Sequence, residues 1–329
     1  MRIISKEIDM AESSQKGSAI FNDIEMGIGT WAWGDRLVWG YGNQYAADDI
    51  EQTFLAAVSN GITFFDTAEV YGQGKSEKFL GQLIPRASVN LKIASKIMPF
   101  PWRISKDALR KALTGSLKRL GLPKIDLYQI HWPMPPVSIE SWMAQMAEVQ
   151  SEGLISAIGV SNYDLEQTKR AVDALAKKGT TLASNQVEFH LLERRIEKNG
   201  MLDFCNANGV KVIAYSPLAM GILSGKYTPD NPPKGTRAGQ YNRPLLEKIQ
   251  PLIKMLKSIG MDHDGKTASQ VALNWVICKG TLPIPGAKNV GQLEQNAGAV
   301  GWRLSEEEMH KLDELSDRIS QTISGIEQE

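Results

Sequence analysis

Four side chains able to donate, accept or orient a proton stand at or just beyond the ends of three predicted strands. The apolar run Ile62–Phe65 stops at Asp66, and Tyr71 follows closely. The next two apolar runs along the chain end at Lys96 and His131. Short apolar runs of this kind are typical of buried strands that deliver their last residue to the edge of a sheet. An acid, a phenol, an ammonium and an imidazole gathered there suit proton transfer to a carbonyl oxygen.

Each of the four also has an ordinary structural interpretation. Asp66 could cap a turn, Lys96 could be a solvated lysine, and His131 and Tyr71 could simply pack. Their occurrence together at three consecutive strand ends favours a site. The other histidines, at 190, 263 and 310, show no ligand spacing with His131 or with acids, so we expect no metal.

The elements that would position these residues alternate between strand and helix. Eight strands are predicted, at Glu25–Gly29, Ile62–Phe65, Leu91–Ser95, Asp126–Ile130, Ala157–Val160, Ala183–Val187, Val210–Tyr215 and Thr281–Ile284. Eight strand–helix units without an internal linker favour an α/β fold of the closed (β/α)8, or TIM, barrel type. A doubly wound sheet is the alternative. It is disfavoured because no Gly-x-Gly-x-x-Gly follows the first strand.

Local signals mark the ends of several helices. Asp164 with Gln167, and Thr267 with Gln270, have the spacing of capping boxes, while Gly121 is placed to end a helix. We expect one domain over residues 21–320, including an extra helix near the C-terminus that ends around residue 320. A short polar segment (1–20) precedes the domain, and a polar tail (321–329) follows it.

Composition narrows the classes of function. The 329 residues include 37 basic and 37 acidic side chains, so no charge excess points to nucleic acid or an anionic membrane as a partner. No apolar run approaches the roughly 20 residues of a membrane span. The two cysteines, Cys205 and Cys278, lie in helical patterns and indicate a reducing compartment. We expect a cytoplasmic protein, or a stromal one if the chain is a processed plastid protein.

Two segments interrupt the alternation. Trp31–Tyr45 is rich in aromatic residues, and Leu218–Arg243 is rich in glycine and proline. In a barrel both would lie at the C-terminal rim, where ligands bind. The segment Gly72–Ser76 has part of a phosphate-loop pattern, but Glu69 stands where that loop needs its first glycine, so we interpret it as a turn.

With these residues in place, the chain resembles the aldo-keto reductases. The matching stretches, in order, are Phe65–Gly72, Leu127–Pro133, Ile158–Tyr163, Asn185–Glu188, Tyr215–Leu218 and Ile284–Ala287. Each is weak alone, but six in order are specific, and the similarity runs from Gly27 to Trp302. Within the family, the sequence resembles plant and cyanobacterial members, which include pyridoxal reductases. The family has the barrel inferred above, and its members reduce aldehydes and ketones with NADPH.

The resemblance implies roles for the four residues. Tyr71 would be the general acid, Lys96 and Asp66 would tune it, and His131 would orient the carbonyl group. A free tyrosine has a pKa of about 10, and a neighbouring ammonium favours the phenolate. We therefore expect Lys96 to lower the pKa of Tyr71.

The resemblance also implies an NADPH site. Its expected residues are Thr30, Trp31, Asp66, Ser161, Asn162, Gln186, Tyr215, Ser216, Pro217, Leu218, Gly221, Lys226, Arg237, Gly286, Lys288, Gln292, Gln295 and Asn296. The Tyr215 ring would stack on the nicotinamide. Lys288 and Gln292, at a predicted helix N-terminus, would bind the 2′-phosphate, because helix N-termini attract anions. No aspartate that would select NAD is evident there.

The resemblance implies a small carbonyl compound as the substrate. The expected walls of its pocket are Trp31, Trp33, Phe100, Trp102 and Trp132. Aromatic walls bind flat or apolar molecules, so we expect broad reduction of aldehydes, with aromatic aldehydes included and pyridoxal as a candidate. Most simple members of the family are monomers, and we expect a monomer here. The alternative is an NADPH-sensing interaction protein that resembles the potassium-channel β-subunits built on the same fold.

Overall fold

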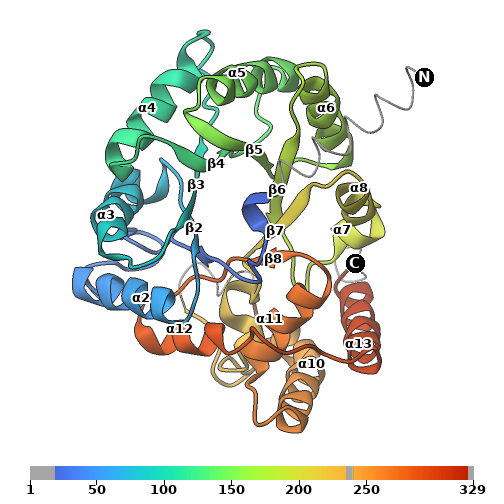
Figure 1. The fold of residues 1–329 in the computed structure, drawn as a ribbon. Coiled ribbons are helices and arrows are strands. Elements are labelled where there is room, and N and C mark those ends of the chain that lie inside the picture. Colours follow the sequence, from blue (N-terminus) through green and yellow to red (C-terminus); the bar gives the residue numbers. More distant parts are fainter. Residues whose placement is uncertain (1–18, 235–238, 240, 325–329) are drawn as a thin grey trace.

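Eight parallel strands form the centre of the molecule and helices surround them (Figure 1). This computed structural model describes residues 19–234, 239 and 241–324. The strands pair in chain order as β1 (Ile28–Gly29), β2 (Phe64–Asp66), β3 (Lys92–Ile97), β4 (Ile125–Ile130), β5 (Ile155–Ser161), β6 (Leu182–Glu188), β7 (Lys211–Tyr215) and β8 (Leu282–Pro283). The predicted barrel is confirmed. The first and last strands are shorter than expected.

Main-chain contacts between the two short strands close the ring. The Gly27 amide donates to the Pro283 carbonyl at 3.0 Å, and the Gly29 amide donates to the Pro285 carbonyl at 3.2 Å. A Cβ at Gly27 would lie 2.5 Å from a ring carbon of Phe64. Only glycine lets the backbone approach so closely, which explains why the chain carries glycine at this seam.

Several helices begin and end where the sequence signals predict. They are α2 (Ala47–Ser59), α3 (Lys75–Leu83), α4 (Ala108–Leu120), α5 (Ile139–Ser151), α6 (Leu165–Ala176), α7 (Arg195–Lys198), α8 (Met201–Ala207), α10 (Arg243–Asp262), α11 (Ala268–Cys278), α12 (Val290–Ala297) and α13 (Glu306–Ser324), with short 3-10 turns η1 (Ala19–Phe21), η2 (Tyr71–Gly74), η3 (Ile84–Arg86) and η4 (Ala219–Ser224). The Asp164 side chain accepts from the Gln167 amide at 2.8 Å, and Thr267 accepts from Gln270 at 3.3 Å, so both capping boxes are confirmed. The extra helix α13 continues past the expected end to Ser324.

The barrel interior is apolar toward the N-terminal ends of the strands and polar at the mouth, where their C-terminal ends meet. Its lower layer consists of buried side chains from seven strands and η1: Phe21, Phe64, Ala94, Leu127, Ala157, Ala183, Ile213 and Leu282. Successive inward side chains of a strand are two residues apart. The next inward positions on β2, β3 and β4 are therefore Asp66, Lys96 and Gln129. All three are almost completely buried. The strand alternation thus delivers polar groups to one end of an otherwise apolar barrel.

An irregularity between β5 and β6 changes which side chains face inward. The pairing skips Ala183, so that one residue of β6 is left over. Beyond this bulge Gln186 reaches the barrel interior, where it contacts Asp66. Its neighbour Asn185 turns toward the helices and donates to the Thr168 hydroxyl at 3.0 Å. Bulges re-aim side chains in this way and are frequent near active sites.

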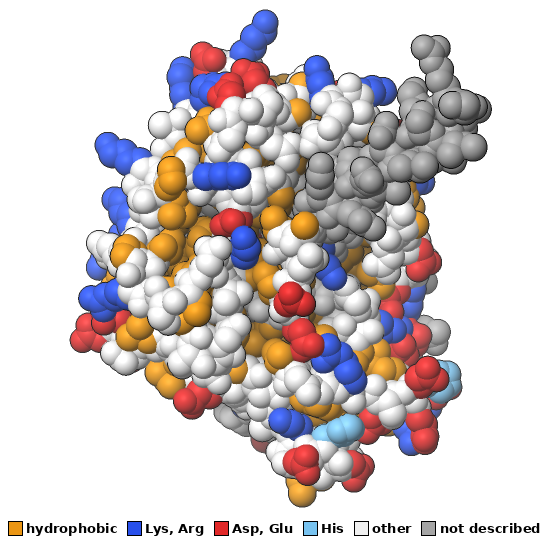
Figure 2. All heavy atoms as spheres, in the orientation of Figure 1, with side chains coloured by type: hydrophobic (Ala, Val, Ile, Leu, Met, Phe, Trp, Pro, Cys, Tyr) orange, Lys and Arg blue, Asp and Glu red, His pale blue; other side chains and the backbone are white. Residues whose placement is uncertain are grey.

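Within the described residues, no helix has the length and apolar character needed to cross a membrane. On the face shown in Figure 2, acidic and basic side chains are interspersed. This distribution accords with the zero formal net charge of the chain.

Candidate active site

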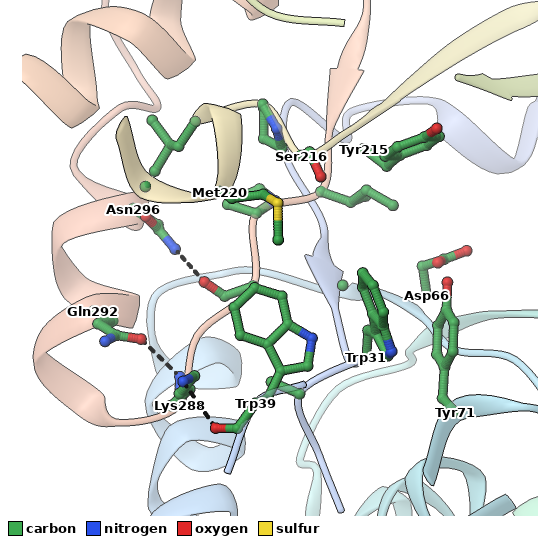
Figure 3. Close-up of a pocket in the computed structure, with 18 of the residues that line it drawn as sticks. Trp31, Trp39, Asp66, Tyr71, Tyr215, Ser216, Met220, Lys288, Gln292 and Asn296 are labelled. Carbon is green, nitrogen blue, oxygen red and sulfur yellow. Dashed lines mark hydrogen bonds between the residues drawn. The ribbon is translucent and has the colours of Figure 1, made fainter. Parts of the chain in front are cut away.

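A cavity of about 880 Å³ opens where the C-terminal ends of the strands meet (Figure 3). Nineteen of the residues predicted from the sequence line it, namely Trp31, Asp66, Tyr71, His131, Trp132, Ser161, Asn162, Gln186, Tyr215, Ser216, Pro217, Leu218, Gly221, Lys226, Gly286, Lys288, Gln292, Gln295 and Asn296. They come from segments on all sides of the barrel. The fold therefore brings together residues that are far apart in the chain.

Three of the four proton-handling residues form a buried hydrogen-bonded group. The Lys96 ammonium forms an ion pair with the Asp66 carboxylate and donates to the Thr67 carbonyl at 2.9 Å. It also lies 3.3 Å from the Tyr71 hydroxyl oxygen. Lys96 is completely buried, and Asp66 is 1% exposed. A buried ammonium is tolerated only with such partners, so Lys96 is held in one place against Tyr71.

The pKa of Tyr71 lies above its ordinary value, although Lys96 lowers it as expected, because a larger effect opposes Lys96. Burial disfavours the phenolate and raises the pKa, and the Lys96 charge lowers it by less; the Asp66 charge adds to the increase. For Lys96, burial lowers the pKa, but the Asp66 and Tyr71 interactions outweigh this effect and raise it overall. Near neutral pH the pair is therefore a phenol beside an ammonium. A protonated phenol is the form that can donate a proton.

His131 completes the proton-handling group from the end of β4. Its ring meets the Tyr71 ring edge-on, with the centroids 5.7 Å apart. Burial first, and then the Lys96 charge, lower the pKa of His131 to about 3, so the imidazole is neutral. In the part of the chain that the structure describes, its Nδ1 is buried without a hydrogen-bond partner. No group of three or more His, Cys, Asp or Glu side chains in that part is placed to hold a metal ion.

A second polar chain lies beside this group. The Tyr215 hydroxyl donates to the Asn162 side-chain oxygen at 2.9 Å, and the Asn162 amide donates to the His131 carbonyl at 3.1 Å. Asn162 and Ser216 have φ angles of 61° and 50°. Non-glycine residues in this left-handed region are uncommon and gather at functional sites. The ends of β5 and β7 are therefore held in unusual backbone conformations around the cavity.

The far end of the cavity is built on the N-terminus of α12. The Asn289 side chain caps the helix by accepting from the Gln292 amide at 2.9 Å, and the Gln292 side chain accepts from the Lys288 amide at 3.0 Å. The Lys288 ammonium donates to the Trp39 carbonyl at 3.1 Å. A helix N-terminus with a cation beside it is suited to bind an anion.

Aromatic rings connect the two ends of the cavity. Trp39 meets Trp31 edge-on at 5.6 Å between centroids, and Trp31 stacks on Tyr71 at 6.0 Å with planes 25° apart (Figure 3). Trp39 and Tyr45 line the cavity, although we assigned neither to the site from the sequence. Their position in the aromatic-rich insert was the available signal. The rest of the lining that we did not predict is Gly29, Ala32, Gln44, Val70, Met220, Ser224, Tyr227, Ser269, Ile284, Pro285 and Asn289.

Two residues near the first strand do not line the cavity, and their assignment is corrected. Trp33 is completely buried, and its indole N–H donates to the Ala287 carbonyl at 3.0 Å. Thr30 is also buried, and its hydroxyl bonds the Asp66 main-chain oxygen at 2.9 Å. A tight turn, in which the Trp33 amide donates to the Thr30 carbonyl, separates the directions of Trp31 and Trp33. Of these two indole side chains, only that of Trp31 lines the cavity.

Two further predicted wall residues lie elsewhere on the surface. Phe100 and Trp102 stack on each other with centroids 4.6 Å apart, and neither belongs to the cavity lining. Trp102 is 73% exposed.

Lys96 does not itself line the cavity, but it contacts the lining residue Tyr71 from the barrel interior. Arg237 lies outside the described residues.

Comparisons with known proteins agree with this geometry. The model of the Aldo/keto reductase family matches residues 25–317. The chain is 40% identical over 306 residues to the chloroplastic pyridoxal reductase of Arabidopsis thaliana, covering 88% of this chain and 82% of that protein. An aldo/keto reductase of Klebsiella pneumoniae in complex with NADP and acetate is 30% identical with a TM-score of 0.67, covering 89% and 91%. A glycerol dehydrogenase of Gluconobacter oxydans is 29% identical with a TM-score of 0.78 and the same coverage.

Proposed function

The chain belongs to the aldo/keto reductase family, and from this premise we propose that it reduces aldehydes and ketones to alcohols with NADPH. The observation that carries the proposal is the 3.3 Å contact between Lys96 Nζ and Tyr71 Oη at the wall of a large cavity. This contact supports the role of Tyr71 as an acid, because a phenol beside a buried cation at the cavity wall is suited to meet a carbonyl oxygen.

The cavity has the features that a dinucleotide needs. Its volume of about 880 Å³ lies in the upper part of the range for ligand pockets, roughly 300–1,000 Å³. The Tyr215 ring and the Gln186 amide lie on the side of the catalytic group, suited to a nicotinamide and its carboxamide. Lys288 and the N-terminus of α12 lie at the far end, suited to a phosphate. When bound there, NADPH supplies a hydride from the nicotinamide C4.

The residues of the chain then handle the proton and the substrate. Tyr71 donates its phenolic proton to the carbonyl oxygen, and the Lys96 ammonium stabilises the phenolate that remains. Asp66 keeps Lys96 charged and in position. His131, neutral because of its lowered pKa, is suited to hydrogen-bond the same oxygen without competing as a stronger acid.

The rings at the cavity mouth favour flat substrates. Trp31 and Trp132 line the cavity and are 39% and 42% exposed, so their rings are accessible to a flat molecule that enters it. We include aromatic aldehydes and pyridoxal among the substrates. The similarity to the Arabidopsis protein named pyridoxal reductase supports the inclusion of pyridoxal.

The test is the consumption of NADPH with 4-nitrobenzaldehyde and with pyridoxal, followed by absorbance. We expect turnover by the wild type and a loss of at least about a hundredfold in Tyr71→Phe, in line with the contribution of a general acid. Tyr163→Phe is the matched control, because Tyr163 is a buried phenol outside the cavity.

NADPH binding, followed by quenching of protein fluorescence, should be kept in both variants. Full activity of Tyr71→Phe would remove that residue from the role of acid. A wild type that binds NADPH but reduces no aldehyde would instead favour a nucleotide-sensing protein.

A further inference from the structure

The catalytic carboxylate is held by two buried amides as well as by Lys96. Asp66 Oδ2 accepts from Gln129 Nε2 at 3.1 Å and from Gln186 Nε2 at 2.9 Å. Gln186 Nε2 also lies 3.4 Å from Gln129 Oε1. Gln129 is completely buried and does not line the cavity, whereas Gln186 does. Gln129 therefore contacts Asp66 and Gln186 from the barrel interior and not from the cavity.

The carboxylate determines how both amides are oriented. An ionised carboxylate only accepts hydrogen bonds, so each glutamine must turn its N–H group toward Asp66. With Nε2 so committed, Gln186 offers its Oε1 to the cavity, where it can accept from a carboxamide N–H. Gln129 supports this orientation, because its own Oε1 faces Gln186 Nε2. The orientation of the Gln186 amide, which lines the cavity, thus depends on the Asp66 carboxylate that pairs with Lys96.

The barrel is built around Gln129. A Cβ at Gly159 on the neighbouring strand would lie 2.8 Å from Gln129 Cγ and 2.5 Å from the Ser184 hydroxyl oxygen. Any larger residue at 159 would push against the stem of Gln129. The bulge at Ala183 brings Gln186 alongside. A glycine on one side and a bulge on the other leave room for this glutamine.

We propose that Gln129 is a positioning residue of the reaction, which locks the Asp66 carboxylate and the Gln186 amide in fixed relation to each other. The inference rests on the proposed function. Through Asp66 and Lys96 the lock extends to the Tyr71 hydroxyl, and through Gln186 it extends to the nicotinamide side of the cavity. Gln129 acts on both without touching substrate or cofactor.

The first test is Gln129→Met, which keeps the length of the side chain and removes the amide. We expect kcat to fall about tenfold, the usual effect of losing one hydrogen bond to a charged group. The Kd of NADPH and the KM of the aldehyde should change less than about threefold, because the lining itself is intact. Tyr128→Phe is the control, because it alters the residue directly before Gln129 in β4, which packs in the layer between strands and helices.

Gln129→Glu gives a signature that a merely structural role would not. A protonated carboxyl can donate to Asp66 as the amide does, whereas an ionised one repels it. Burial beside a carboxylate raises the pKa of the introduced acid above its ordinary value of about 4.3. The activity of Gln129→Glu, relative to wild type, should therefore fall as pH rises through that raised value. Gln129→Met should show a loss independent of pH.

The outcomes separate this inference from the proposed function. Wild-type kcat in Gln129→Met, or a pH profile of Gln129→Glu that runs parallel to the wild type, would overturn the inference alone. A wild type without turnover would overturn both. If thermal melting shows that Gln129→Met is unfolded, the pH profile of Gln129→Glu decides the matter.

Discussion

The Lys288 ammonium lies 5.0 Å from the centre of the Trp39 indole ring, while it donates to the carbonyl oxygen of the same residue at 3.1 Å. The Tyr45 ring, at 5.2 Å, forms a second face of this aromatic cage. Cations are attracted to the faces of such rings. The cage therefore holds the ammonium at the N-terminus of α12, where we propose that the 2′-phosphate binds.

Removal of this charge should weaken NADPH binding selectively. In Lys288→Met we expect the Kd of NADPH to rise roughly 10- to 100-fold, in line with one hydrogen bond between charged groups, and the Kd of NADH to change little. Titration of protein fluorescence with each nucleotide measures both. Lys178→Met, at an exposed position on another side of the barrel, is the control. Equal losses for the two nucleotides would show that Lys288 does not select the 2′-phosphate.

Loss of the ring stacked on Tyr71 should affect aromatic substrates most. Trp31→Ala removes a wall of the cavity, and we expect kcat/KM for 4-nitrobenzaldehyde to fall about fivefold, since a contact between aromatic rings contributes about 1 kcal/mol beyond simple burial. A small aliphatic aldehyde should lose less. Trp102→Ala is a matched control, because its ring is exposed outside the cavity. An equal loss in Trp102→Ala would restore Trp102 to the substrate pocket.

The neutral His131 should make the fold less stable in acid. Its folded pKa of about 3 is below the ordinary 6.5, so between these values the unfolded chain binds a proton that the folded chain does not. The free energy of unfolding should thus decrease as pH falls from 6.5 toward 3, by up to about 1.4 kcal/mol per pH unit from this group. Urea denaturation at several pH values measures the slope, and His131→Asn should reduce it. An imidazole that titrates near pH 6.5 by NMR would contradict the expectation.

Asn274 should be critical for stability although it is remote from the cavity. Its amide donates to the Ala299 and Trp302 carbonyls at 2.9 and 2.8 Å, and its oxygen accepts from the Leu304 amide at 3.0 Å. Asn274→Leu would leave these groups without partners, and we expect a loss of roughly 3 kcal/mol. Denaturation in urea at neutral pH measures it. Asn208→Leu, at an exposed site, should cost less than about 0.5 kcal/mol, and equal effects would contradict the assignment.

The order of elements was predictable because each signal is local. The capping boxes at Asp164 and Thr267 and the apolar runs of the inner strands depend only on neighbouring residues. The strands β1 and β8 were harder, because their pairing depends on glycines that allow close approach between distant segments. The proposed catalytic group was predicted from strand ends, which a barrel gathers at one rim.

The details of the site depend on direction and depth, which a sequence does not encode locally. Trp31 and Trp33 are two positions apart, yet a turn sends one into the cavity and the other into the core. Gln129 sits inside an apolar run and shows its role only when Gly159 and Gln186 are placed around it. The raised pKa of Tyr71 follows mainly from desolvation of the phenol in the fold, whereas the strand pattern predicted only its charged neighbour Lys96.

The glycine seam that joins β1 to β8 has a consequence for any experiment on this protein. Trp31 follows the first of these strands, and Lys288 follows the last, so neighbouring parts of the pocket lining, which meet at Trp39, are supplied by segments far apart in the polypeptide. The affinity for the nucleotide should consequently depend on whether β1 and β8 pair and close the barrel. A larger residue at Gly27 that separates β1 from β8 should abolish NADPH binding, while far-ultraviolet circular dichroism should still show intact helices.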